Sequence, residues 1–246
     1  MCGRYALTTP AEVIAQIFRL GVISDYVPRW NIAPTQSAPV IRADRSTGER
    51  RLDLLRWGLV PFWAKDESIG NRMVNARSES VAQKPPFREL LERRRCIIPA
   101  DAFYEWSKPS SSRQKKQPFA LRLKDDRVFG FAGLWDRWKG PKDAPLQQPL
   151  ESYTILTTSP NVVAGQLHDR MPVMLVLPEQ WDRWLDVSAS AAAALQPLLQ
   201  PVPDAAMHVY PVSTRVNTPD NDDPELLREA PIAKSQTNTI EPGLFE

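Results

Sequence analysis

The sequence predicts a single α+β domain in which antiparallel strands curl into a barrel-like core and a few helices lie at the periphery. Of its 246 residues, 24 are proline, about twice the usual frequency of ~5%, which favours short strands and rigid turns over long helices. Many short apolar runs are separated by turns, only a few segments have helical periodicity, and no internal repeat divides the chain. Strands with a minority of helices are typical of the α+β class.

The first expected helix follows residues 9–12, where Thr9, Pro10 and Glu12 form a capping-box pattern with proline in the first turn. We expect this helix to end at Gly21. Two extended runs then flank a glycine-containing turn at 46–48, which predicts a β-hairpin. The expected extended segments are 4–7, 31–35, 38–43, 51–63, 96–106 (as strand, turn and strand), 118–123, 128–135, 153–158, 172–177 and 207–212. Further helices are expected at 85–95, 179–185 and 188–199, and a polar hairpin tip at 109–117.

The composition is that of an ordinary soluble globular protein, with 42% apolar and 24% charged residues. No stretch has the ~20 apolar residues needed to span a bilayer, and the amino terminus lacks the pattern of a signal peptide. We therefore expect no membrane partner and a cytoplasmic, nucleoid-associated protein. The two cysteines fit a reducing compartment, and Cys96, in an apolar run, is expected to be buried and inert.

Charge divides the chain into a basic body and an acidic tail. Residues 217–246 carry seven acidic against two basic residues, a charge of −5, which leaves +7 for residues 1–216 out of a total of +2. A basic body indicates a polyanionic partner. We expect residues 1–216 to form the domain and residues 217–246 a partly disordered acidic tail.

The amino terminus carries the most distinctive chemistry. Methionine aminopeptidase removes Met1 when the second residue is small, which would leave Cys2 with a free α-amine beside its thiol. The reference pKa values, roughly 7.7–8.0 for the amine and about 8.5 for the thiol, predict partial deprotonation of both near neutral pH. Such an aminothiol can capture an aldehyde as an imine and close a five-membered thiazolidine. The ring-opened sugar of an abasic site in DNA is an aldehyde of this kind.

One spacing recurs three times along the chain. Cys2 and Arg4, Asn75 and Arg77, and His168 and Arg170 each place a reactive or hydrogen-bonding group two residues before an arginine. In an extended backbone, residues i and i+2 point to the same face about 6.5–7 Å apart. Each pair could hold a sugar with one side chain and a neighbouring phosphate with the guanidinium, whose planar fork suits phosphate oxygens.

Glu105 is the expected acid–base group. Strand alternation puts it on one face with Phe103, and a carboxyl beside an aromatic ring has a raised pKa. A carboxylate paired with a nearby lysine is the alternative. Two cysteines and two histidines lie scattered without zinc-site spacing, so neither a metal nor a cofactor is expected. Phe62 and Trp63, at the edge of a polar loop, could stack on bases.

These motifs together resemble the SOS-response-associated peptidase family, whose members shield abasic sites in single-stranded DNA by crosslinking to them. The resemblance runs from MCGRY through NIAPT, WGLVPFW, VNARSE, RRRCIIPADAFYEW, FAGLW, TILTT and HDRMP to VSTRVN. The chain departs from the family in a longer loop at 65–72. The family fold is an α+β domain with a barrel-like core, as expected here.

The resemblance implies a role for each candidate. Cys2 would be the nucleophile, Asn75 would position the amino terminus, Glu105 would shuttle protons and His168 would assist ring opening. The residues that would contact DNA are Arg4, Arg77, Arg170, Pro34, Thr157, Phe62 and Trp63. The expected partner is single-stranded DNA with abasic sites, bound by a monomer. Two alternatives stay open: an amino-terminal-nucleophile or thiol peptidase, and a module that only binds single-stranded or modified DNA.

Overall fold

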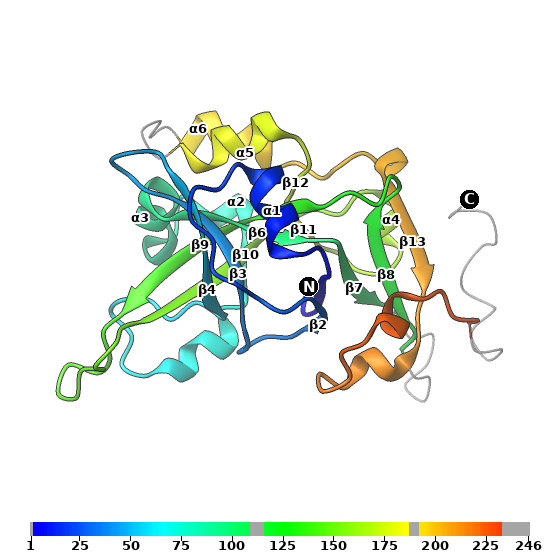
Figure 1. Cartoon of the computed structure of the whole chain (residues 1–246), viewed down its shortest axis with the longest axis horizontal. Coiled ribbons are helices and arrows are strands. Elements are labelled where there is room, and N and C mark those ends of the chain that lie inside the picture. The colour runs from blue at the N-terminus through cyan, green and yellow to red at the C-terminus, as the bar shows by residue number, and fades with distance from the viewer. Residues whose placement is uncertain (1, 109–115, 187–191, 233–246) are drawn as a thin grey trace.

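A computed structural model describes residues 2–108, 116–186 and 192–232, and a closed five-stranded β-barrel lies at its centre (Figure 1). The barrel strands are β3 (Ser37–Ala43), β4 (Arg50–Trp57), β6 (Arg95–Ala100), β9 (Phe129–Trp138) and β10 (Leu150–Thr158). They follow the order β10-β4-β3-β6-β9, and β9 also pairs with β10, which closes the barrel. The predicted α+β class with a barrel-like core is confirmed.

The barrel is mixed, whereas the sequence predicted antiparallel strands throughout. β10 runs parallel to β4, with Tyr153 opposite Trp57, and parallel to the short strand β5 (Asn75–Arg77), with Ile155 opposite Asn75. β5 therefore lies along β10 beyond the end of β4. The chain leaves β4 at Gly58 and reaches β5 after a loop of sixteen residues, 59–74. Parallel pairing needs a long connection, and local patterns do not encode partners so distant in sequence.

A second sheet of five strands packs beside the barrel. Its order is β13 (Met207–Pro211), β8 (Pro118–Leu123), β7 (Ala102–Trp106), β1 (Tyr5–Leu7) and β2 (Arg29–Ile32). The short strands β11 (Met171–Pro172) and β12 (Met174–Leu175) extend the barrel sheet at β10 and β9. Since β1 lies between β7 and β2, this sheet carries the amino terminus to the middle of the molecule (Figure 1).

Short helices surround the strands. They are α1 (Ala11–Phe18), α2 (Ser78–Val81), α3 (Pro85–Arg93), α4 (Val162–Gly165), α5 (Pro178–Leu185) and α6 (Ala192–Leu195), with 3-10 turns at Glu67–Arg72, Gln196–Leu199, Asp204–Ala206, Thr214–Asn217 and Pro224–Leu227. The expected capping box of α1 is wrong, because the Thr9 hydroxyl donates to Asp101 at 2.7 Å instead of capping the helix. The helix ends at Arg19 in the left-handed conformation, φ 55°, before Gly21. None of the described helices is long and apolar enough to span a membrane.

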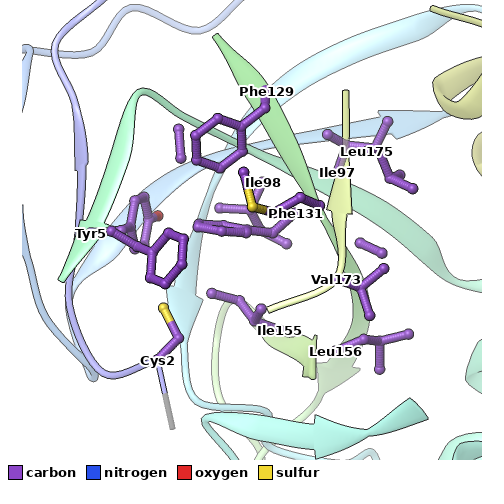
Figure 2. Packing of buried hydrophobic residues seen from close by; sticks show 14 of the residues in the cluster. Cys2, Tyr5, Ile97, Ile98, Phe129, Phe131, Ile155, Leu156, Val173 and Leu175 are labelled. Carbon is purple, nitrogen blue, oxygen red and sulfur yellow. The ribbon is translucent and has the colours of Figure 1, made fainter. Parts of the chain in front are cut away.

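The barrel interior is filled by aliphatic and aromatic side chains (Figure 2). Trp57 is fully buried, as expected, and Cys96 lies in the same cluster. Tyr5 and Tyr153 share a hydrogen bond of 2.8 Å between their hydroxyl oxygens, which satisfies both polar groups inside the core. Because Tyr5 comes from the second sheet and Tyr153 from the barrel, this contact fixes the amino-terminal strand against β10.

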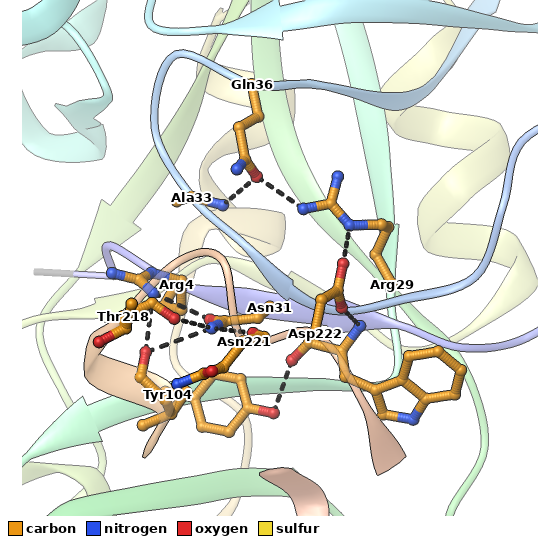
Figure 3. Close-up of polar contacts among 11 residues, drawn as sticks. Arg4, Arg29, Asn31, Ala33, Gln36, Tyr104, Thr218, Asn221 and Asp222 are labelled. Carbon is orange, nitrogen blue, oxygen red and sulfur yellow. Dashed lines mark hydrogen bonds and ion pairs between the residues drawn. The ribbon is translucent and has the colours of Figure 1, made fainter. Parts of the chain in front are cut away.

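The segment expected as an acidic tail begins on the domain itself (Figure 3). The Asn31 amide donates to the carbonyl oxygens of Thr218, at 3.0 Å, and Asn221, at 2.7 Å. Asp222 pairs with Arg29 and accepts from the Trp30 amide. Residues 217–227 thus pack against β2, and residues 229–230 pair with the end of β13. Residues 233–246 lie outside the described residues, as do most of the expected hairpin tip (109–115) and the residues 187–191.

Candidate functional site

Cys2 lies beside Glu105 because the amino-terminal segment runs antiparallel to β7. Tyr5 is opposite Phe103, and one residue further the Tyr104 amide donates to the Arg4 carbonyl oxygen at 3.0 Å. Continued in the same register, this pairing brings residues 2–4 alongside the end of β7. The Cys2 side chain is fully buried at the edge of the apolar cluster and its Sγ contacts the Arg4 carbonyl oxygen at 3.9 Å (Figure 2).

Asn75 reaches the same point from the barrel. Its Nδ2 donates to the Cys2 carbonyl oxygen at 2.8 Å. Its Oδ1 is buried and has no hydrogen-bond partner in the part of the chain that the structure describes. Asn75 therefore holds the carbonyl group of Cys2 with its Nδ2 donor, and its Oδ1 stays available as an acceptor beside the amino terminus.

A contact between two glycines holds the strand that carries Asn75. A Cβ on Gly70 would lie 2.7 Å from the Gly58 carbonyl oxygen and 2.6 Å from Nη1 of Arg56. Gly58 itself adopts φ +115°, a conformation that favours glycine. Near this contact, the Trp57 indole donates to the Val74 carbonyl oxygen at 2.9 Å. The 3-10 turn of the inserted loop is thereby fixed against the end of β4, and β5 leaves it in register with β10.

We expect Gly70→Ala to lower the free energy of unfolding by about 1–3 kcal/mol, the usual cost of forcing extra volume into a packed contact. The measurement is the denaturant midpoint of the variant against that of the parent chain. Gly165→Ala is the matched control, because the nearest atom to its Cβ would be 3.5 Å away. Equal losses in the two variants would contradict the packing argument.

Glu105, on β7, is 4% exposed, and this burial raises its pKa to about 7, while the positive charge of the chain's amino terminus opposes the rise. A carboxyl with a pKa near 7 exchanges protons at neutral pH, which suits general acid–base chemistry. The desolvation expected from its place beside Phe103 agrees with this direction.

His168 follows α4 and presents its ring to the same region. Partial burial lowers its pKa, and the positive charge of the amino terminus lowers it further, so the ring is neutral near pH 7. Nδ1 accepts a hydrogen bond from the Arg170 amide at 3.0 Å and also lies 2.7 Å from Oδ1 of Asp169. His168 and Arg170 are not on a strand, so the predicted same-face spacing does not apply to them.

The Cys2 thiol differs from the expectation for a free aminothiol. Burial raises its pKa well above the usual range, and the negative charge of Glu105 raises it further. Partial ionisation of this thiol near neutral pH is therefore wrong for the folded chain. The thiol needs a base to become a nucleophile, and Glu105 is the nearby carboxylate.

The three predicted phosphate-binding arginines lie in different environments. Arg77 is exposed on β5. Nη1 of Arg4 donates to Asn31 Oδ1 at 2.9 Å and to the Val216 carbonyl oxygen at 2.8 Å, which ties the amino-terminal segment to the carboxy-terminal one (Figure 3). Arg170 forms a two-pronged ion pair with Glu79.

The remaining candidates divide between buried and exposed positions. Thr157 is fully buried on β10, and Pro34 is half-buried in the turn between β2 and β3. Phe62 and Trp63 are 62% and 49% exposed on the inserted loop. Phe62 lines a surface cavity of about 460 Å³ with Arg94, Arg137 and Lys139 among the other lining residues. The cavity is also lined by Glu89 and Asp136, and Arg94 pairs with Asp136 at 3.0 Å. An exposed aromatic ring with Arg137 and Lys139 beside it is suited to a nucleic-acid strand.

Two contact residues were missed by sequence analysis. Asn31 holds Arg4, and Glu79 holds Arg170, although both lie in motifs that were recognised, NIAPT and VNARSE. Asn31 and Glu79 each lie two or more residues from a candidate in the sequence, and that spacing does not predict either contact. Among the described residues no group of three or more His, Cys, Asp or Glu side chains could hold a metal ion.

Fold and site define a class of protein: a mixed β-barrel with a flanking sheet, in which an amino-terminal cysteine lies beside an amide, a carboxyl of pKa about 7 and a neutral histidine. Residues 1–219 match the model of the family described as SOS response associated peptidase (SRAP). The chain belongs to this family.

Several relatives are similar over most of their length. The chain is 43% identical to the abasic site processing protein YoqW of Bacillus subtilis, over 92% of this chain and 99% of that one. It is 33% identical to the abasic site processing protein HMCES of Gallus gallus, over 82% of this chain and 66% of that one. A crystal structure of a Bacteroides thetaiotaomicron protein superposes with a TM-score of 0.80 at 25% identity, covering 93% of this chain and all of the other.

Proposed function

We propose that this protein recognises abasic sites in single-stranded DNA and captures their aldehyde as a covalent thiazolidine through the amine and thiol of Cys2, which shields the lesion from strand cleavage. The observation that carries the proposal is the placement of Cys2, fully buried beside Glu105 with Asn75 on its carbonyl oxygen at 2.8 Å. Relatives named for abasic-site processing at up to 43% identity support it.

The first step is attack of the Cys2 amine on the aldehyde carbon of the opened sugar. His168, neutral near pH 7, can take the proton of the anomeric hydroxyl and pass it to the ring oxygen as the sugar opens. The partnerless Oδ1 of Asn75 can accept a hydrogen bond from the amine once Met1 has been removed, which would orient its lone pair. The product of this step is a carbinolamine.

Glu105 then acts twice. Its protonated carboxyl gives a proton to the leaving hydroxyl, so that water departs and a protonated imine (an iminium ion) forms. The resulting carboxylate takes the proton of the Cys2 thiol, and the sulfur adds to the imine carbon while the electron pair of the C=N bond returns to nitrogen. One water is lost overall, and Glu105 ends protonated as it began. A carboxyl with a pKa of about 7 is suited to both directions of transfer.

The surface around the site suits a single strand. Arg77 is exposed and can bind a backbone phosphate, and Phe62, exposed like its neighbour Trp63, lines a cavity with Arg137 and Lys139. Stacking on aromatic rings requires bases that are not paired, because the bases of a duplex cover one another. We infer that the strand crosses the barrel end with its abasic sugar at Cys2.

Intact mass spectrometry before and after exposure to an abasic oligonucleotide tests the proposal. We expect the purified protein to have lost Met1 and then to gain the mass of the oligonucleotide less one water. An intact abasic strand with unchanged protein mass would contradict the crosslink. Hydrolysis of peptides that needs Cys2 and ignores DNA would favour the peptidase alternative, and reversible binding alone would favour the non-covalent reader.

A further inference from the structure

Glu79, the second residue of α2, occupies the anion-binding edge of Arg170. Its two carboxylate oxygens accept from Nη1 at 2.6 Å and from Nη2 at 2.8 Å. The Glu79 side chain is 53% exposed, whereas that of Arg170 is 13% exposed. The Arg170 guanidinium is therefore largely buried, and the Glu79 carboxylate covers the edge that would otherwise face solvent.

Arg170 is fixed independently of Glu79. Its Nη2 donates to the Thr157 carbonyl oxygen at 2.5 Å, and Thr157 lies fully buried on the barrel strand β10. Its backbone amide donates to Nδ1 of His168 at 3.0 Å. The position of the guanidinium is thus set by the strand and by the loop that carries His168, and loss of Glu79 would leave both contacts in place.

Arg77 acts on the same carboxylate. The hydrogen bonds from Arg170 are the first cause of the lowered pKa of Glu79, and the positive charge of Arg77 contributes to it. Glu79 therefore pairs with one of the arginines that the sequence predicts as phosphate ligands, Arg170, and lies within the electrostatic influence of the other, Arg77. A carboxylate and a phosphodiester carry the same single charge and accept from the two prongs of a guanidinium in the same way.

We propose that Glu79 is a specificity-determining residue that occupies, in the free protein, the position of a backbone phosphate, and that a correctly placed strand exchanges this phosphate for the carboxylate. The inference rests on the proposed function. The half-exposed carboxylate returns to water and the phosphate takes over both guanidinium bonds, so the exchange costs little for a phosphate held beside His168 and Cys2. A strand bound in another register would meet a neutral surface there.

The test is the affinity of Glu79→Gln for a single-stranded oligonucleotide that carries a tetrahydrofuran abasic analogue. The analogue has no aldehyde, so only reversible binding is measured, by fluorescence anisotropy. We expect the variant to bind about two- to five-fold more tightly than the parent chain at low ionic strength, because the half-exposed carboxylate no longer competes with the phosphate for the guanidinium. The gain should shrink at ~1 M salt, where the Debye length is about 3 Å.

Two controls make the result specific. Glu12→Gln removes the same charge from an exposed position of α1 and should change affinity little. In an Arg170→Ala background, Glu79→Gln should give no gain, because the site that the carboxylate blocks is gone. A gain that persists without Arg170 would overturn the exchange and assign the effect to overall charge.

Unchanged or weaker binding by Glu79→Gln would also overturn the inference, and weaker binding with a lowered melting temperature would identify Glu79 as a brace for Arg170. A parent chain that fails to bind the strand, and fails to crosslink authentic abasic DNA, would refute the proposed function itself. A parent chain that crosslinks while Glu79→Gln gains nothing refutes the exchange alone.

Discussion

Replacing Cys2 with alanine is expected to abolish the heat-stable crosslink to an abasic oligonucleotide. Alanine is small enough for Met1 to be removed, so the variant keeps a free α-amine in the same place. It can form an imine, which hydrolyses on heating, but it has no sulfur to close the ring. The measurement is a denaturing gel after heating, where the shifted band should be lost completely.

Borohydride separates the two nucleophiles. Reduction during the reaction converts an imine to a stable amine, so Cys2→Ala should become crosslinked when borohydride is present and only then. Cys96→Ala is the matched control, because Cys96 is the other buried, free cysteine and has no α-amine beside its thiol. Its crosslinking should match that of the parent chain. A heat-stable band from Cys2→Ala without reductant would refute the thiazolidine.

An uncleaved residue ahead of Cys2 makes the complementary change. It converts the α-amine to an amide and leaves the thiol in place, so imine formation and crosslinking should both be lost, with or without borohydride. Tag removal that leaves Cys2 as the first residue should restore them. Activity of the extended chain would show that the thiol alone attacks the sugar.

Local patterns predicted the parts of the fold that are encoded locally. The hairpin around residues 46–48 formed as expected, with Gly48 at φ +74°. The helix expected at 85–95 spans Pro85–Arg93, because proline suits the first turn and Leu90 and Leu91 supply a buried edge. Strand alternation likewise put Phe103 in the core and Glu105 beside it.

Long-range pairing decided what the sequence did not predict. The register of β5 on β10 places Asn75 at Cys2, and it depends on a loop that returns to the line of β4 and on the close contact of Gly58 with Gly70. The same holds for charge: the spacing of Arg77 and Arg170 suggested two open phosphate sites. Only the folded chain brings Glu79 onto the guanidinium of Arg170.

Burial accounts for the correction at the nucleophile. A reference pKa describes a solvated thiol, whereas the Cys2 thiol is fully buried beside a carboxyl, and both conditions raise its pKa. The Cys2 thiol therefore needs a base to lose its proton, which the reference pKa did not indicate. The acid–base group that the mechanism needs becomes the most informative position to change after Cys2.

Glu105→Gln is expected to slow crosslinking by on the order of 10²–10⁴-fold, the range for loss of a positioned acid–base group. Glutamine keeps the shape and hydrogen-bonding capacity of the side chain but neither gives up nor takes a proton. Rates should be measured with the abasic strand in excess over enzyme, so that binding does not limit them. An unchanged rate would remove Glu105 from the chemistry.

The pH dependence identifies the group. Dehydration needs the protonated carboxyl, with a pKa of about 7, and the first step needs the free amine, with a reference pKa of roughly 7.7–8.0. The rate follows the fraction of Glu105 that is protonated multiplied by the fraction of the amine that is deprotonated. This product gives a bell-shaped pH profile with a maximum between the two pKa values. In Glu105→Gln the alkaline limb should vanish, and the residual rate should rise with pH to a plateau. A bell that persists in the variant would assign the alkaline limb to another group.

Stability separates this effect from unfolding. A carboxyl whose pKa is raised in the folded chain binds its proton more tightly there than in the unfolded chain, so stability falls as pH rises from about 4.5 to about 7 and stays reduced above that window. Glu105→Gln removes the buried charge and should therefore be more stable than the parent chain at pH 8, by on the order of 1–3 kcal/mol. Near pH 4 the two proteins should be alike. A variant that is slower yet more stable at alkaline pH would show that the fold tolerates the cost of a buried carboxylate because the chemistry requires its proton.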